Sequence, residues 1–457
     1  MSESGEMVDA PHASPGKRQE RDRNGRLESI RRSSEENAPS FIRHVDMAHA
    51  SATKPVVLPR TLQDLSREFG EADYAESTKL SRFTSNCHVG QRKLSLALIE
   101  FLTEVHRNQT TMGPVTVVYA GASIVAAMAA HDLFPGDVFI CFDPVVEMTL
   151  SVAERTLGLN AKRRISERVA IKYATMSPQL TNKSLQTKPI VLFTGSSSGT
   201  FSDSTCAWAK EVARLRGQEI AFASDIRKGG HGAAKECAIA EDMVNQARWA
   251  LAMRTRFYFF KFRLPFDMSR DIRARYAKLS HGVASEDADK VLYLDGTCVL
   301  QKYAPEFSTE MRLIGTRIPT LVEYDIRSVE RLFAPFNVVH RGNTCFVPYP
   351  SRDGKRPISP QAMAQALPHI HQSSGCHGAF DIMGEACAIR DAVELNRGGD
   401  KAFSDSMSRF HSLFTGRSGP PGTTTGGASG LHSPFAGTTV LGTCLAIAVG
   451  AAFASSP

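Results

Sequence analysis

Lys261 combines a residue type and a position that could support proton transfer. It interrupts an almost unbroken run of aromatic and apolar residues, Phe257–Asp267, whose composition is typical of a buried strand. An ammonium group taken out of water costs several kcal/mol unless it finds a partner or gives up its proton. This lysine therefore either reaches the surface along its own alkyl stem or is tuned for chemistry.

Two carboxylates are expected at the ends of neighbouring strands. Glu219–Arg227 is a second short apolar segment that delivers Asp225 at its carboxyl end, where open α/β sheets bind ligands. Val299–Ile314 is interpreted as a further strand that delivers Glu310. With Lys261 they predict a catalytic cluster, in which burial favours the neutral amine and the carboxylates favour the ammonium.

A strand followed by a glycine turn predicts a nucleotide-like ligand. Pro114–Ser123 contains Gly121, where the missing Cβ lets the backbone approach a ligand closely. The next strand ends at Asp143, about 20 residues past the turn, which is the spacing of an acid that binds ribose hydroxyls. A strand-end aspartate without a role is an equally common outcome. Gly195–Gly199 lacks the Gly-Lys-Ser/Thr ending of a phosphate loop, which argues against a nucleoside triphosphatase.

Strand and helix patterns alternate along the middle of the chain, which predicts an α/β fold with a Rossmann-like sheet and helices on both faces. Lys93–Val105 has apolar residues at helical spacing, so Lys93 begins a helix. Residues 146–188 include one candidate strand more than this sheet needs. Of Arg168–Tyr173 and Lys188–Thr194, the second is favoured because one helix fits between it and Asp225.

Composition limits the class of protein. The chain has 457 residues, of which 42% are hydrophobic, so it can bury a large core. A net charge of +7 suits a polyanionic partner without being diagnostic. Nine cysteines without a CxxC pair argue against a disulfide framework and for a reducing compartment. No apolar segment follows the amino terminus, so secretion is not expected.

Four regions are predicted along the chain. Residues 1–55 are a disordered head of mixed charge, and residues 56–345 form the α/β domain. Residues 346–414 are a weakly helical extension whose His and Cys spacing predicts no metal site. Residues 415–457 are a Gly/Ser/Thr linker and an apolar tail. Thr438–Ala454 is uncharged and just long enough for a membrane span of ~17–25 residues, so a tail anchor and a tail without fixed structure both stay open.

Five short motifs occur in an order and at spacings that are similar to one known family. They are Gly90–Leu94, Val117–Gly121, Ser224–Arg227, Lys261–Asp267 and Ala304–Leu313. The chain resembles, over roughly residues 70 to 340, the poxvirus-type cap-specific mRNA (nucleoside-2′-O-)-methyltransferase and poly(A) polymerase regulatory subunit family. Each motif alone is weak, but five in register are hard to produce by chance.

The resemblance implies a set of catalytic residues and a methyl donor. The family's Lys-Asp-Lys-Glu tetrad corresponds to Lys93, Asp225, Lys261 and Glu310. The implied donor is S-adenosyl-L-methionine, bound by Gln91, Tyr119, Gly121, Asp143 and Asp225. The chain departs from the family at Val125, in place of a second glycine, and at Val145, in place of an arginine.

The resemblance also implies that capped mRNA is the substrate. An N7-methylated guanine is a cation, so two aromatic rings attract it more strongly than the neutral base, and carboxylates accept its N1 and N2 hydrogens. The implied cap-binding residues are Tyr74, Phe266, Asp267, Phe307 and Glu330. Each of them taken singly is also an ordinary surface aromatic or acid.

Three functions stay open at this point. The first is transfer of a methyl group to the ribose 2′-OH of the first transcribed nucleotide of N7-methylguanosine-capped mRNA. The second is a non-catalytic processivity subunit of a poly(A) polymerase, in contact with its catalytic subunit. The third is a catalytically inactive cap- or RNA-binding protein, which the changes at Val125 and Val145 favour. By resemblance, the expected location is the host cytoplasm and the virion.

Overall fold

The computed structural model describes residues 56–69, 90–109, 113–158, 160–174, 176–227, 232–265, 269–280, 289–304, 308–352, 357–374 and 378–415. The predicted head and the apolar segment Thr438–Ala454 lie outside the described residues. In the part of the chain that is described, no helix is both long and apolar enough to cross a bilayer.

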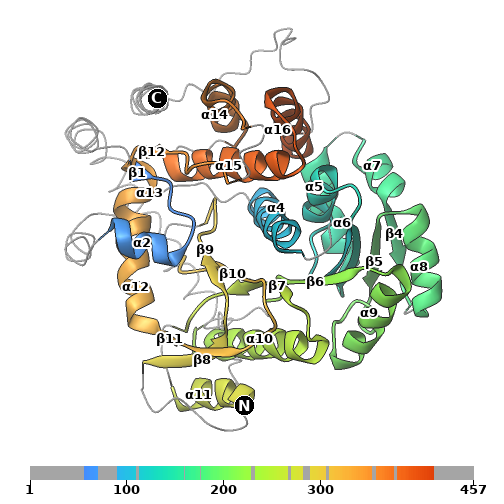
Figure 1. Ribbon diagram of the computed structural model, residues 1–457. Coiled ribbons are helices and arrows are strands. Elements are labelled where there is room, and N and C mark those ends of the chain that lie inside the picture. Colours follow the sequence, from blue (N-terminus) through green and yellow to red (C-terminus); the bar gives the residue numbers. More distant parts are fainter. Residues whose placement is uncertain are drawn as a thin grey trace, which may run out of the picture. The chain divides into compact units, whose positions relative to one another are not determined.

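A mostly parallel sheet of eight strands lies at the centre (Figure 1). In spatial order its strands are β4 (Val169–Lys172), β5 (Ile190–Thr194), β3 (Val138–Asp143), β2 (Val115–Ala120), β6 (Glu219–Ser224), β7 (Phe257–Phe262), β10 (Met311–Gly315) and β9 (Thr297–Val299). The strands from β4 to β7 pair in parallel, whereas β10 runs antiparallel to both β7 and β9. The predicted α/β class is confirmed.

Helices cover both faces of this sheet (Figure 1). One face carries α4 (Gly90–Asn108), α5 (Ile124–Leu133), α6 (Val146–Leu157) and α7 (Ala161–Arg168). The other face carries α8 (Pro178–Thr187), α9 (Asp203–Arg216) and α10 (Gly232–Met253). Strands β2 and β3 are almost entirely buried, as expected for parallel strands that are covered on both sides.

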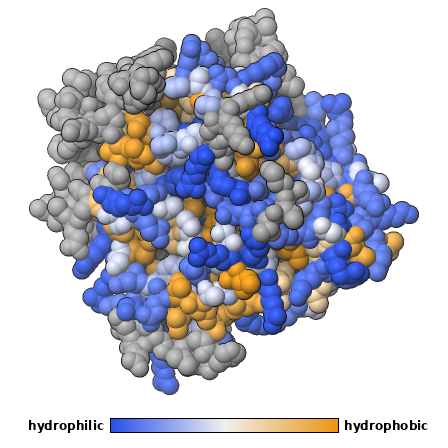
Figure 2. Space-filling model, viewed as in Figure 1, coloured by the Kyte–Doolittle hydropathy of each residue, from blue (hydrophilic) through white to orange (hydrophobic). Residues whose placement is uncertain are grey.

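Smaller elements surround this core. They are β1 (Val56–Val57) paired with β12 (Phe346–Val347), β8 (Lys290–Leu294) paired with β11 (Leu321–Asp325), and the helices α2 (Leu62–Glu68), α11 (Arg270–Tyr276), α12 (Ile326–Pro335) and α13 (Arg341–Asn343). On the face shown in Figure 2, hydrophilic residues cover most of the described surface and hydrophobic ones form separate patches. Scattered apolar residues of this kind are normal on protein surfaces.

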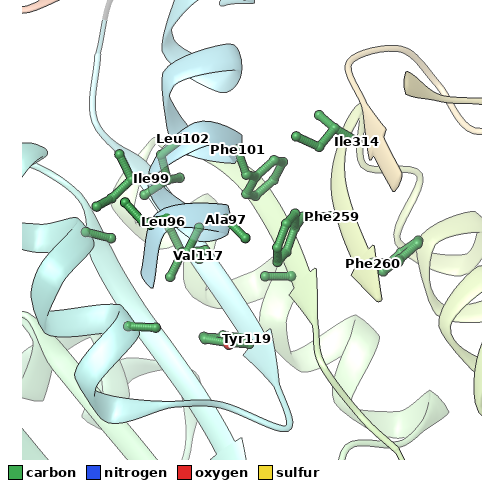
Figure 3. Close-up of a cluster of buried hydrophobic side chains, with 14 of the residues drawn as sticks. Leu96, Ala97, Ile99, Phe101, Leu102, Val117, Tyr119, Phe259, Phe260 and Ile314 are labelled. Atoms are coloured by element: carbon green, nitrogen blue, oxygen red, sulfur yellow. The ribbon is translucent and has the colours of Figure 1, made fainter. Parts of the chain in front are cut away.

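Aromatic and aliphatic side chains fill the space between α4 and the sheet (Figure 3). Phe101 of α4 stacks on Phe259 of β7 with ring centroids 5.3 Å apart, and both rings are fully buried. Leu96 and Ala97 of the same helix lie over Val117 of β2. The hydrophobic core therefore fixes α4 directly above the strands that were expected to carry the catalytic residues.

Two strand predictions are wrong in detail. Val299–Ile314 is not one strand, because β9 ends at Val299 and β10 begins at Met311, with a loop between them. Glu310 is the last residue of that loop. Both candidate strands form: the favoured Lys188–Thr194 gives β5, and Arg168–Tyr173 gives the edge strand β4 beside it. The α/β sheet thus has one parallel strand more than predicted.

Three helices follow the α/β core: α14 (Pro360–Ser374), α15 (Ala379–Leu395) and α16 (Asp400–Thr415). Their apolar pattern in the sequence is weak, yet every residue of α15 from Phe380 to Glu394 is buried. This helix packs against α4, between α4 and the pair α14 and α16 (Figure 1). Residues on the two sides of the boundary expected at 345 consequently share one hydrophobic core.

Candidate active site

The structure brings the four predicted catalytic residues together at one edge of the sheet. Asp225 directly follows β6, and Lys261 is the last residue but one of β7. Glu310 directly precedes β10, and because β10 is antiparallel, its start meets the ends of β6 and β7. Lys93 comes from the first turn of α4 above them. The antiparallel strand is therefore what brings Glu310 to the carboxyl edge.

Distances within this cluster are those of ion pairs. The Lys261 Nζ lies 3.7 Å from Asp225 Oδ1 and 3.4 Å from Glu310 Oε2. The Lys93 Nζ lies 3.7 Å from Glu310 Oε1. Between 9% and 18% of each of these four side chains is exposed, so the cluster is largely desolvated but still reachable.

Arg312 is a fifth charged residue of the cluster, and sequence reasoning missed it. Its Nη1 donates to Asp225 Oδ1 at 2.6 Å, and its Nη2 lies 3.7 Å from Glu310 Oε1. Its side chain is only 1% exposed, and its residue pairs with Lys261 across the strands β7 and β10. The available signal was the same as for Lys261, namely a lone cation inside the apolar segment Met311–Gly315.

Charges in the cluster favour an anionic reaction centre. Lys93, Lys261 and Arg312 face Asp225 and Glu310, which leaves one surplus positive charge when all five residues are ionised. Burial alone would raise the pKa of Asp225, but Lys261 and Arg312 outweigh it and hold that pKa below its usual value. The pKa of Glu310 is held low in the same way. Both carboxylates therefore stay ionised at neutral pH.

The pKa of Lys93 is shifted strongly downward. Burial lowers its pKa to about 8, and the opposing attraction of Glu310 does not compensate for that loss of hydration. Arg312 and Lys261 push in the same direction as burial, since both are cations near the Lys93 ammonium. Lys93 is thus protonated at neutral pH but loses its charge in mildly alkaline solution.

The glycine turn after β2 lets two segments of the chain pack closely, whereas the predicted approach of a ligand stays a prediction. Gly121 adopts φ +67°, and a Cβ at this position would lie 2.9 Å from the backbone nitrogen of Ile226. Its own N–H donates to the carbonyl of Phe142 at 2.9 Å, and the N–H of Asp225 donates to the carbonyl of Ala120 at 3.0 Å. The ends of β2, β3 and β6 are therefore drawn together where only glycine fits.

The other predicted donor-binding residues surround this turn, with one difference. The Gln91 side chain accepts a hydrogen bond from the Ser123 hydroxyl, which also caps α5. Asp143 lies at the end of β3, where its Oδ1 accepts from the Val145 N–H at 2.8 Å. The side chain of Tyr119 instead points into the core beneath α4, with its hydroxyl fully buried (Figure 3).

Several buried polar atoms near this edge have no hydrogen-bond partner among the described residues. They are Tyr119 Oη, Thr194 Oγ1, Ser224 Oγ, and Arg312 Nε and Nη2. Native proteins leave few such groups unsatisfied, and those that remain call for a water, an ion or a ligand. They lie beneath the ends of β2, β5 and β6 and the start of β10, where they are buried from solvent.

The side chains of the five predicted cap-binding residues lie outside the part of the chain that the structure describes. Tyr74, Phe266, Asp267 and Phe307 lie outside the described residues. Glu330 belongs to α12, but its side chain is outside the described part as well. Among the side chains that are described, no three His, Cys, Asp or Glu residues are grouped so that they could hold a metal ion.

A cavity of about 1000 Å³ lies between α14 and α16, away from the cluster. Its wall is mostly uncharged, with glutamine, serine and histidine side chains, and includes Ser373 and His411.

Comparison with family models finds no match for the chain, and comparison with curated proteins finds no significant relative. The resemblance to the poxvirus family thus depends on the five sequence motifs.

Proposed function

We propose that the chain transfers a methyl group from S-adenosyl-L-methionine to the ribose 2′-OH of the first transcribed nucleotide of capped mRNA. The observation that carries this proposal is the convergence of Lys93, Asp225, Lys261 and Glu310 from four separate elements onto one edge of the sheet. Ion pairs between distant strands are common, but this set matches the tetrad that the sequence motifs imply. The proposal therefore combines independent support from motif and from geometry.

The sheet order supports a nucleoside-containing methyl donor. The central strands β5, β3, β2, β6 and β7 follow the 3-2-1-4-5 order of nucleotide-binding sheets. That order reverses between β2 and β6, which is where such sheets bind their ligands. Gly121 follows β2 and Asp225 follows β6, so both residues flank this point. The antiparallel β10 beyond β7 suits the Rossmann-like methyltransferase form of the sheet.

The point between β2 and β6 where the strand order reverses indicates which residues would bind the donor. Gln91, Gly121, Asp143 and Asp225 would hold the donor, with Asp143 placed for its ribose hydroxyls. The donor supplies an electrophilic methyl group on a positively charged sulfur. The turn at Gly121 packs the end of β2 against Ile226 beside Asp225, which draws these donor-binding residues together.

The residues of the cluster divide the remaining chemistry between them. The 2′-oxygen forms the new bond to the methyl carbon while the carbon–sulfur bond breaks, so the hydroxyl must lose its proton. Lys261 accepts that proton as the general base, and Asp225 and Glu310 hold its nitrogen in place. The positive charge of Lys93 stabilises the negative charge that develops on the oxygen.

A direct assay tests the proposed reaction. Purified full-length protein is incubated with methyl-labelled donor and short RNA that carries an N7-methylguanosine cap. We expect label on the 2′-oxygen of the first nucleotide, and none when that oxygen is already methylated. If the protein binds donor and capped RNA but transfers no label, the enzyme proposal fails and a non-catalytic cap-binding role replaces it.

The titration of Lys93 predicts how the reaction depends on pH. Its pKa of about 8 lies below that of a free lysine, so the folded protein loses this charge as pH rises through about 8. We expect the transfer rate to fall above that pH, because the neutral amine no longer stabilises the developing alkoxide. Rates measured from pH 6.5 to 9.5 with saturating substrates check this.

The matched control is Lys93→Arg, whose guanidinium stays charged throughout this range. It should be slower at pH 7 because its shape differs, but its rate should not fall above pH 8. A wild-type rate that keeps rising to pH 9.5 would show that the charge of Lys93 is not needed.

A further inference from the structure

The residue next to Lys93 in the first turn of α4 makes a buried bidentate ion pair. Arg92 donates from Nε to Glu385 Oε2 at 2.7 Å and from Nη2 to Glu385 Oε1 at 2.6 Å. Both side chains are 0% exposed, and Glu385 belongs to α15 in the carboxyl-terminal helices. Paired hydrogen bonds between a guanidinium and a carboxylate fix orientation as well as distance.

Glu385 is itself held by two further side chains, Tyr303 and His411. The Tyr303 hydroxyl donates to its Oε2 at 2.8 Å, and His411 Nε2 lies 3.1 Å from its Oε1. Arg92 Nη2 also donates to the hydroxyl of Ser373 at 3.0 Å. Burial alone would raise the pKa of Glu385, but Arg92 and His411 lower it to about 2, so the carboxylate is ionised at any physiological pH. The pair therefore cannot be released by ordinary changes in acidity.

Helix α15 also contacts the loop between β9 and β10, which ends at Glu310. One turn before Glu385, Asp381 Oδ1 accepts from the Tyr303 N–H at 2.7 Å and from Arg341 Nη2 at 2.6 Å. Gln301, two residues before Tyr303 in the chain, donates from Nε2 to Glu310 Oε1 at 3.2 Å. Helix α15 is thus connected to both partners of the Lys93–Glu310 contact through short chains of buried hydrogen bonds.

We propose that Arg92 and Glu385 are positioning residues, which hold the first turn of α4 so that Lys93 lies over Glu310. This inference deepens the proposed function, because it assigns a role in that site to the carboxyl-terminal helices. Lys93 is a long side chain with many rotamers, and a fixed backbone position lowers the entropy cost of holding its nitrogen near Glu310. The ion pair supplies this restraint from the adjacent residue of the same helical turn.

Titration of the Lys93 amine tests the proposal without any need for turnover. Trace labelling with acetic anhydride at different pH values, read by mass spectrometry on the Lys93 peptide, gives its midpoint in the intact chain. We expect about 8 in the wild type. In Glu385→Gln the released turn lets Lys93 reach water, so the midpoint should rise by about one pH unit or more. Arg92→Lys should shift it in the same direction, because it keeps the charge but loses the bidentate geometry.

A matched control separates positioning from general destabilisation. Asp391 is a buried carboxylate on the same helix, bonded to the Tyr349 hydroxyl at 2.7 Å and to Arg390 at 2.8 Å. It lies 3.7 Å from Arg60, which pairs with Glu104 in the last turns of α4. Asp391→Asn should lower stability and leave the Lys93 midpoint near 8.

The direction of the shift decides the outcome. Removing a negative charge would lower the Lys93 midpoint if Glu385 acted only through its electric field. A lowered or unchanged midpoint in both Glu385→Gln and Arg92→Lys overturns the positioning role. If the wild type transfers no methyl group but the midpoint still rises in these variants, the proposed function fails and the positioning of Lys93 stands.

Discussion

Lys261→Ala is expected to reduce methyl transfer by about 10²–10⁴-fold, the usual contribution of a positioned general base. The variant removes an amine nitrogen that lies within 4 Å of both carboxylates of the cluster. Donor affinity should change little, because Gln91, Gly121 and Asp143 remain in place. Single-turnover transfer to capped RNA, together with calorimetric binding of the donor, separates the two effects.

Lys290→Ala is the matched control for this experiment. Lys290 is also a strand lysine paired with a carboxylate, since its Nζ lies 3.6 Å from Glu323 Oε2, but it belongs to β8 outside the cluster. Its replacement should leave the transfer rate unchanged. Equal rates for wild type and Lys261→Ala would exclude Lys261 as the base, whatever the control shows.

Gly315→Ala is expected to destabilise the fold by about 3 kcal/mol, at the upper end of what overpacking a core costs. Gly315 pairs with Tyr258 between β10 and β7, and a Cβ there would lie 1.9 Å from the ring carbon Cζ of that tyrosine. The ring is buried and its hydroxyl donates to the carbonyl of Asp295, so it cannot move aside easily. Unfolding in urea measures the loss.

A double-mutant cycle makes this test specific for the register of β10. Tyr258→Leu removes the ring, so the two changes together should cost less than their sum, with a coupling of about 2 kcal/mol. Gly342→Ala is a control, because nothing lies within 4 Å of its added Cβ. If Gly315→Ala were as mild as Gly342→Ala, the pairing of β10 with β7 would be wrong, and with it the position of Glu310.

The main strands of the sheet and the charged residues at their ends could largely be predicted from the sequence, because both depend on local patterns. A run of apolar residues predicts each parallel strand, and a charged residue at its end predicts what reaches the carboxyl edge. Lys261 and Asp225 were identified in this way. Lys93 was assigned only through the family resemblance, since a lysine at a helix start has no pattern of its own.

The parts that could not be predicted depend on contacts between distant segments. Arg312 is a partner of Asp225 only because β10 is antiparallel, and strand direction is set by the connection and not by composition. Helix α15 shows weak periodicity because it is buried on all sides, so no single apolar stripe marks it. In the sequence alone Glu385 resembles a solvated helix residue, because its partner Arg92 is distant in the chain.

The pair of Arg92 and Glu385 also has a consequence for biosynthesis. The two residues are 293 positions apart in the chain. A ribosome that adds 5–20 residues per second needs roughly 15–60 s between them. During that interval the sheet strands emerge and can pair, but the first turn of α4 lacks its ion pair with Glu385. We therefore expect a nascent chain to bury most of its core before Lys93 is fixed over Glu310, so that the charged cluster is completed only after α15 has been synthesised.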